Sequence, residues 1–243
     1  PGLGDEDRRL CDIIQREAGR LNHLVSDMMD LARPREPEPE AVDVVALARD
    51  VVELASRSER SASGDVQVVY EGPDRPVWAT CDGGQMRQVL WNLVRNGVQA
   101  SGAGSTVTVS VEETSDRVKL AVSDQGPGIE PQAQAKIFDA FFTTRSQGAG
   151  MGLAVVRRII DDHAKVGATI AVRSAAAREE SGELKRKSGG KTTSVDSNSK
   201  RDRDKTPSDR GATFEVGLAR APSPGTRSPE TTREERETGH ATS

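Results

Sequence analysis

The first part of the chain repeats apolar residues at the spacing of one helix face. Between Asp5 and Ala32 the apolar side chains follow steps of three or four residues, with one polar interruption: Leu10, Ile14, Leu21, Leu24, Met28 and Leu31. This spacing predicts a long helix with a narrow apolar stripe of the kind that helix bundles bury. Prolines at positions 34, 37 and 39 end the helix, so we expect its partner helices to come from upstream or from another chain. The alternative is a single amphipathic helix that folds back on the main domain.

Beyond the prolines, the pattern alternates between helix and strand spacing. Apolar residues at helical steps predict helices over residues 44–54, 85–100 and 152–163. Short apolar runs predict strands over residues 66–70, 77–80, 106–111, 118–123, 169–172 and 211–218. Several side chains of the middle helix are expected to point inward: Met86, Val89, Leu90, Leu93, Val94 and Val98. The order of elements predicts an α/β fold, a two-layer sandwich in which helices cover one face of a mixed, mostly antiparallel sheet.

Composition divides the chain further. Only 34% of its residues are hydrophobic and 3% are aromatic, so part of it cannot join a packed core. Between Arg178 and Arg210 the large apolar residues are Leu184 and Val195, which predicts an unstructured insert between two strands of one sheet. The expected organisation is a partial helical domain, a linker, an α/β domain with its insert at about 176–210, and an unstructured tail, over residues 1–33, 34–42, 43–220 and 221–243.

Net charge and cysteine content indicate which partners and which cellular environment to expect. The formal net charge is −4 and the isoelectric point is near 5.6, so no overall basic field favours nucleic acid as a partner. Cys11 and Cys81 are too few for a disulfide framework. Apolar runs stay well short of the roughly 20 residues that span a membrane, and the N-terminal residues lack a signal-peptide pattern. We therefore expect a reducing, cytoplasmic environment.

Two side-chain amides lie one helical turn apart on the predicted helix 85–100. Asn92 and Asn96 therefore point from the same face. Amide oxygens can bind Mg²⁺ directly or through its waters, and neutral ligands suffice where a triphosphate brings the negative charge. For either residue alone, the alternative is an asparagine that ties a helix to a loop.

A carboxylate and two glycines follow the predicted strand 118–123. Asp124 stands at the strand end, before Gly126 and Gly128, where a flat ring could approach the backbone. A carboxylate at such a place accepts a hydrogen bond from the amino group of adenine. Guanine presents an oxygen there instead, so the site should reject it. An ordinary turn containing aspartate is the alternative.

A glycine-rich segment precedes the last predicted helix. Gly148, Gly150 and Gly152 would let backbone N–H groups and the helix N-terminus face phosphate, while residues 147–151 move as a lid. The segment lacks the Gly-Lys-Ser/Thr ending of a P-loop.

Three of the chain's four phenylalanines, Phe138, Phe141 and Phe142, lie shortly before this lid. We expect them to anchor its base, a role that is compatible with a plain core cluster. Polar residues connect the phenylalanines to the lid: Thr143, Thr144 and Arg145. Among these, Arg145 is a candidate phosphate contact.

Together these blocks resemble the catalytic ATP-binding domain of bacterial sensor histidine kinases, within the wider superfamily of gyrase, Hsp90 and MutL. The blocks around Asn96, Asp124, Phe138 and Gly150 are similar to the N, G1, F and G2 boxes of that family. The segment GATF resembles its last box, in which the threonine, here Thr213, helps to hold adenine. The stretch RLNHLVSDMMDLARP is similar to the second helix of the dimerisation and phosphotransfer domain.

The resemblance implies ATP and Mg²⁺ as cofactors. It implies that Asn92 and Asn96 bind the metal, and that these two asparagines and Arg145 act in catalysis. It implies a set of nucleotide-contacting residues: Asn96, Asp124, Gly126, Gly128, Ile129, Phe138, Thr143, Thr144, Gly148, Gly150, Met151, Gly152, Leu153 and Thr213. The implied partners are a response regulator receiver domain and an acceptor-histidine helix of the parent kinase or of a partner, with a homodimer in the full-length protein. The setting could then be the cytoplasmic part of a membrane-bound sensor.

The superfamily divides into kinases, which pass the γ-phosphate to a protein, and clamps, which hydrolyse ATP. The clamps resemble one another in a general-base glutamate four residues before the metal-binding asparagine, a position that is Asn92 here. An amide cannot take a proton from water, which favours phosphoryl transfer. No histidine followed by an acidic residue precedes the first helix, and His23 lacks a neighbouring carboxylate. We therefore expect the acceptor histidine outside this chain; a non-catalytic nucleotide-binding module is the alternative.

Overall fold

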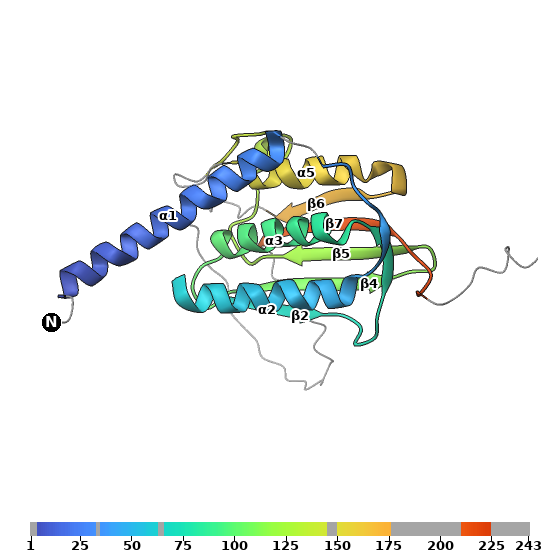
Figure 1. Ribbon diagram of the computed structural model, residues 1–243, viewed down its shortest axis with the longest axis horizontal. Helices are drawn as coiled ribbons and strands as arrows, with labels where there is room; N and C mark the ends of the chain where they lie inside the picture. The colour runs from blue at the N-terminus through green and yellow to red at the C-terminus, as the bar shows by residue number, and fades with distance from the viewer. Residues whose placement is uncertain (1–3, 33–34, 63–65, 145–149, 176–209, 225–243) are drawn as a thin grey trace, which may run out of the picture.

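The computed structural model describes residues 4–32, 35–62, 66–144, 150–175 and 210–224 (Figure 1). Its helices are α1 (Asp5–Ala32), α2 (Val44–Ala62), α3 (Gly83–Ala100), the short α4 (Pro131–Gln134) and α5 (Gly152–Asp162), with a 3-10 turn at Ala164–Val166. Its strands are β1 (Glu40–Asp43), β2 (Gln67–Glu71), β3 (Trp78–Cys81), β4 (Thr106–Glu113), β5 (Arg117–Ser123), β6 (Thr169–Ala175) and β7 (Gly211–Ala219).

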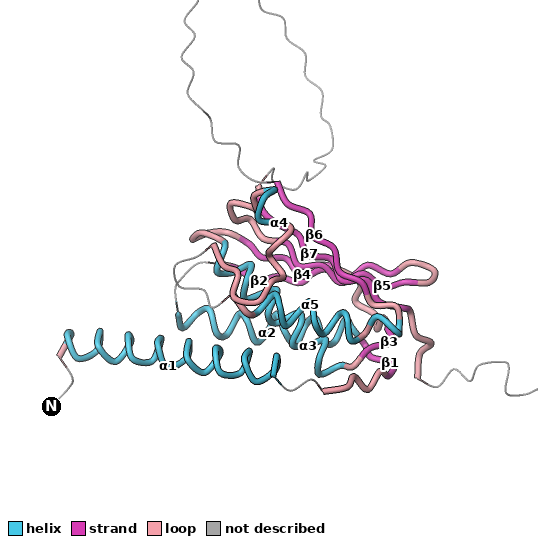
Figure 2. The backbone as a smooth tube through the Cα atoms, turned by 90° about the horizontal axis from the view of Figure 1, so that it is seen from above, coloured by secondary structure: helices cyan, strands magenta, loops and turns pink. Residues whose placement is uncertain are grey.

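The strands form a larger and a smaller sheet. The larger sheet has five strands in the order β2-β4-β5-β7-β6, in which β2 and β4 are parallel and the other neighbours antiparallel. The smaller sheet pairs β1 with β3. Helices α2, α3 and α5 lie along one face of the larger sheet (Figure 2). The expected two-layer sandwich, with a mixed, mostly antiparallel sheet, is confirmed.

The apolar residues that alternate along the strands pack in one core with those at helical spacing along α3. Val109, Leu120 and Val216, on three adjacent strands, are fully buried. The side chains of α3 that were expected to point inward are all buried. Full burial of one such side chain is worth about 1.5–3 kcal/mol, so this shared face dominates the stability of the domain.

A buried histidine fixes the ends of two helices relative to each other. His163, at the end of α5, is 0% exposed. Its Nδ1 lies 2.8 Å from the carbonyl oxygen of Ile159, and its Nε2 accepts a hydrogen bond from the backbone N–H of Asp82 at 3.0 Å. Asp82 is the N-cap of α3, where its Oδ1 accepts from the Gln85 N–H at 3.0 Å. The tie holds α3 and α5 at a fixed spacing, which matters because both carry predicted site residues.

Most elements begin and end close to their predicted bounds, with three differences. The predicted helix 44–54 continues to Ala62 as α2. Residues expected to belong to a linker form β1, and the short helix α4 was not predicted. The strands on either side of the predicted insert pair with each other as β6 and β7. The insert itself and the tail predicted after Ala221 lie almost entirely outside the described residues.

The long helix α1 has the predicted bounds but few neighbours. It contacts α5, beside which its C-terminal end lies, and the rest of the helix extends away from the domain (Figure 1). Large apolar side chains along it are exposed: Leu10, Ile13, Ile14, Leu21, Val25, Met28 and Met29. The alternative of a helix folded back on the domain therefore accounts for one end of α1 but leaves these side chains exposed. None of the described helices combines the length and apolar character that crossing a membrane requires.

Candidate functional site

The carboxylate of Asp124 is held at the end of the central strand β5. Its Oδ1 accepts hydrogen bonds from the backbone N–H of Gly126 at 2.9 Å and of Ala212 at 3.3 Å. The Asp124 N–H in turn donates to the Ala212 carbonyl at 2.9 Å. Because the loop after β5 and the start of β7 both hold this side chain, its position is fixed by the sheet.

Glycines allow the backbone to pack closely around Asp124. A Cβ on Gly126 would lie 2.7 Å from the carbonyl oxygen of Ala100, at the end of α3, and one on Gly211 would lie 2.0 Å from that of Asp124. Both distances exclude a side chain. Gly128 has a φ of 81°, which favours glycine over other residues. Both glycines of the motif at 124–128 are therefore favoured by the structure, Gly126 by close packing and Gly128 by its backbone conformation.

Two serine hydroxyls near Asp124, those of Ser123 and Ser174, were not singled out in the sequence. The Oγ of Ser123 and the Oγ1 of Thr213 lie 2.9 Å apart across β5 and β7. The Ser174 Oγ accepts from the Ile129 N–H at 2.7 Å and donates to the Gly211 carbonyl at 2.9 Å. Ser174 thus ties the loop after β5 to both β6 and β7. The serines could have been suspected only from their places at strand ends.

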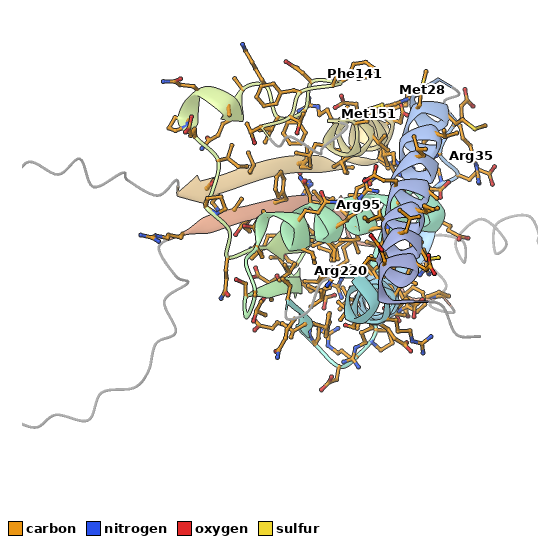
Figure 3. All side chains as sticks on the ribbon, turned by 90° about the vertical axis from the view of Figure 1, so that its left-hand side faces the viewer. Met28, Arg35, Arg95, Phe141, Met151 and Arg220 are labelled. Atoms are coloured by element: carbon orange, nitrogen blue, oxygen red, sulfur yellow. The ribbon has the colours of Figure 1, made fainter. Side chains whose placement is uncertain are left out.

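The predicted amides lie on the half of α3 that approaches α5. Asn92 is 4% exposed and Asn96 is half-buried. The Asn92 Oδ1 lies 3.5 Å from where a Cβ on Gly152 would stand. It also accepts a hydrogen bond from Nη2 of Arg95 at 3.5 Å. A Cβ on Gly97, one residue after Asn96, would lie 3.4 Å from the Cβ of Asp124. The structure therefore brings the amide, carboxylate and glycine blocks to one edge of the domain, the side viewed in Figure 3.

The phenylalanine segment that precedes the predicted lid, residues 147–151, contacts the end of that lid in the structure. The backbone N–H of Phe141 donates to the carbonyl of Gly150 at 2.9 Å. A Cβ on Gly150 would lie 2.6 Å from backbone atoms of Phe141 and Phe142, and its φ is 67°. Met151, the next residue, is buried, and Gly152 and Leu153 begin α5. Arg145 and Gly148 lie outside the described residues.

The phenylalanines do not form one cluster. Phe138 packs edge-on against Phe214, with ring centroids 6.5 Å apart, and Phe142 also packs against the core. Phe141 instead is 70% exposed and has a φ of 68°, which is uncommon for a side chain of this size. Thr143 is exposed beyond it, as is Thr144. Only the rings of Phe138 and Phe142 can therefore form the expected apolar base of the lid.

A separate open cavity of about 320 Å³ lies away from this edge, between β1, α2 and the first turn of α3. It is lined by none of the predicted site residues. The motif residues, rather than this hollow, define the candidate site.

Comparison with known proteins gives the class to which this site belongs. The model of the histidine kinase-, DNA gyrase B-, and HSP90-like ATPases matches residues 81–221, more than half of the chain. The chain belongs to this family.

Its relatives among characterised proteins are sensor kinases. Sensor histidine kinase ZraS of Escherichia coli K12 is 34% identical over 171 residues, which are 70% of this chain and 36% of that protein. Sensor protein kinase PilS of Pseudomonas aeruginosa is 34% identical over 167 residues, 66% of this chain and 31% of that protein. The chain thus spans about a third of these relatives, and it contains a catalytic domain of the sensor histidine kinase type.

Solved structures agree on the architecture. Full-length ShkA in complex with AMPPNP aligns with a TM-score of 0.58 at 26% identity, over 91% of this chain and 40% of that chain. Histidine kinase ThkA in complex with response regulator protein TrrA aligns with a TM-score of 0.62 at 22% identity, over 91% of this chain and 53% of that one. At that identity, the second likeness supports the fold alone.

Proposed function

We propose that this edge of the domain binds Mg·ATP and that, within its parent protein, the domain transfers the γ-phosphate to a histidine located outside this chain. The observation that carries the proposal is the convergence of Asp124, Asn92, Asn96 and the start of α5, which come from separate parts of the sequence. Asp124 accepts from the adenine amino group, with Thr213 beside it. The asparagine amides hold Mg²⁺, and the glycines before α5 approach the phosphates.

The residue types favour transfer over hydrolysis. Asn92 occupies the place at which a hydrolysing clamp needs a base, and its oxygen already accepts a hydrogen bond from Arg95. An amide in that place cannot deprotonate water, which favours a nucleophile that attacks without first losing a proton to a base, as a neutral imidazole does. Arg145 is retained in this proposal as a phosphate contact on the lid.

The proposed partners are inferred from similar proteins of known structure and from the exposed helix α1. ShkA was solved with AMPPNP, which supports a nucleotide site. ThkA was solved with response regulator protein TrrA, and by analogy we propose a receiver domain as the next acceptor. The exposed apolar residues of α1 suit a helix bundle built with a second copy and with the helix that carries the acceptor histidine. We place this domain in the cytoplasm.

Nucleotide binding by the purified chain tests the site. We expect Asn96→Ala and Asp124→Ala each to weaken Mg·ATP binding about ten- to hundredfold, because one buried, charge-assisted contact is worth about 1.5–3 kcal/mol. Calorimetry measures the affinities. Asp116→Ala is the matched control, since this exposed carboxylate lies in the β4–β5 turn, away from the site. Equal binding of ATP and GTP would contradict the role of Asp124, and ATP binding that is independent of Mg²⁺ would contradict the role of Asn96.

Labelling tests the direction of transfer. Incubation of the chain with γ-labelled ATP should leave it unlabelled, and adding a helix that carries the acceptor histidine should produce acid-labile label. Label that appears on the chain alone and disappears in His23→Gln would make His23 the acceptor. Binding without any transfer, even with the acceptor helix supplied, would favour a non-catalytic nucleotide-binding module.

A further inference from the structure

Arg95 lies between the two asparagines on α3, and neither the motif analysis nor the family resemblance gave it a role. Its side chain is half-buried. Its Nη2 donates to the Asn92 Oδ1 at 3.5 Å and lies 3.5 Å from where a Cβ on Gly152 would stand. Figure 3 shows Arg95 on the same side of the domain as Met151, the residue before α5. Its guanidinium therefore stands where the metal-binding face of α3 meets the phosphate-binding start of α5.

The chemistry of this place calls for positive charge. ATP carries several negative charges on its terminal phosphates, which Mg²⁺ offsets only in part, whereas the asparagine amides are neutral and Asp124 adds a further negative charge. A guanidinium presents N–H donors in one plane and matches phosphate oxygens. The N-terminus of α5 also favours an anion at this point. A phosphate bound at the start of α5 would meet both the guanidinium and the helix N-terminus.

The contact with Asn92 has a second consequence. Because Arg95 donates to Oδ1, the Asn92 amide is oriented with its oxygen toward the guanidinium and the start of α5. Asn92 and Arg95 thus form one polar pair at the start of α5, on the same helix as Asn96.

We propose that Arg95 is a further binding residue of this site, which contacts the terminal phosphates of ATP. The proposal rests on the proposed function, since it needs the nucleotide to lie between α3 and α5. A purely structural alternative is that Arg95 only holds the Asn92 side chain. The two differ in their dependence on phosphate: a phosphate contact acts on ATP and ADP but not on AMP, whereas a structural defect acts on all three.

Affinities for AMP, ADP and ATP, measured by calorimetry with Mg²⁺ present, test the proposal. We expect Arg95→Gln to weaken ATP binding about tenfold or more and to leave AMP binding within about twofold, because only the terminal phosphates lose a charged donor. Arg95→Lys should retain part of the ATP affinity, since it keeps a positive charge but not the planar donor group. Arg87→Gln is the matched control on the same helix, where Arg87 pairs with Asp50 at 3.1 Å.

Each outcome bears on the inference. ATP affinity that is unchanged in Arg95→Gln overturns it, as does an equal loss for AMP and ATP, which indicates a structural role. If Arg95→Gln does not fold, Arg95→Lys decides: a loss for ATP that exceeds the loss for AMP supports the proposal, and a change in affinity that is the same for all three nucleotides refutes it. A wild-type chain that binds none of the nucleotides would instead refute the proposed function itself, so the two failures are distinguishable.

Discussion

Helices α1 and α3 share a hydrophobic pattern but not an environment. Both repeat apolar residues at steps of three and four, and both were predicted from this repeat. In α3 the stripe is covered, and Leu90 is 0% exposed. In α1 it is open, with Leu21 62% and Met28 63% exposed.

The difference lies in which elements of this chain each helix packs against. The apolar face of α3 meets α2, α5 and the sheet, all of which belong to the same domain. Among the described elements that α1 contacts, α5 meets only one end of it. The repeat therefore predicts that a helix forms and which face is apolar, but it does not say what covers that face. Exposed large apolar side chains that recur along one helix are typical of an interaction surface, which supports the proposed bundle.

The largest expected effect comes from truncating equivalent leucines of the two helices. Leu90→Ala should lower the free energy of unfolding of the domain by about 2–5 kcal/mol, because it leaves a cavity in the core. Leu21→Ala should change it by less than about 0.5 kcal/mol, because the side chain is exposed. Urea unfolding followed by tryptophan fluorescence suits this comparison, since both tryptophans, Trp78 and Trp91, belong to the domain.

A similar loss in the two variants would mean that part of the domain covers the stripe of α1 in solution. Sedimentation adds a second readout. If the stripe joins two copies, Leu21→Glu combined with Met28→Glu should abolish concentration-dependent association while the unfolding midpoint of the domain stays the same.

The sequence predicted the fold correctly wherever the spacing of apolar residues stayed helical or alternating over a long enough segment. The apolar repeat of α3 and the alternation along β4 and β5 each extend over several turns or residue pairs. It missed β1 because this short strand follows closely spaced prolines, and its only recorded partner among the described strands is β3, distant in sequence. It ended α2 too early because the second half of that helix, SRSERSA, carries hardly any apolar residues.

The site was predictable where function depends on residue type and short spacing. The asparagines, Asp124 and the glycines satisfy that condition. The partnership of Ser123 with Thr213 depends on the register of β5 and β7, whose residues are far apart in the chain. The exposure of Phe141 depends on the backbone path into the lid, and the position of Arg95 depends on how α5 docks on α3. None of these follows from a local pattern.

A smaller effect distinguishes the N-termini of the two helices. Asp82 caps α3 from a buried position and also accepts from the Glu38 N–H at 3.1 Å, with Arg35 at 3.7 Å. Asp7 accepts from the Gly4 N–H at 3.3 Å at the exposed start of α1. Asp82→Ala should therefore cost about 0.5–2 kcal/mol of domain stability, and Asp7→Ala close to none. Asp82→Asn keeps the cap and separates its geometry from its charge.

The charge of Asp82 should make this contribution depend on pH. Burial acts to raise the pKa of the Asp82 carboxyl, but hydrogen bonds from the Gln85 and Glu38 amides, together with Arg35, outweigh it and hold the pKa below its ordinary value of 3.8. Above that value the unfolded and folded chains both carry the charge, and its stabilising contribution is fully present; it is lost as the pH falls through the lower folded pKa. Urea unfolding at neutral pH and near pH 3 should therefore show the advantage of wild type over Asp82→Asn shrinking in acid. Equal stability of wild type and Asp82→Asn at both pH values would mean that the charge contributes nothing and that Asp82 acts through cap geometry alone.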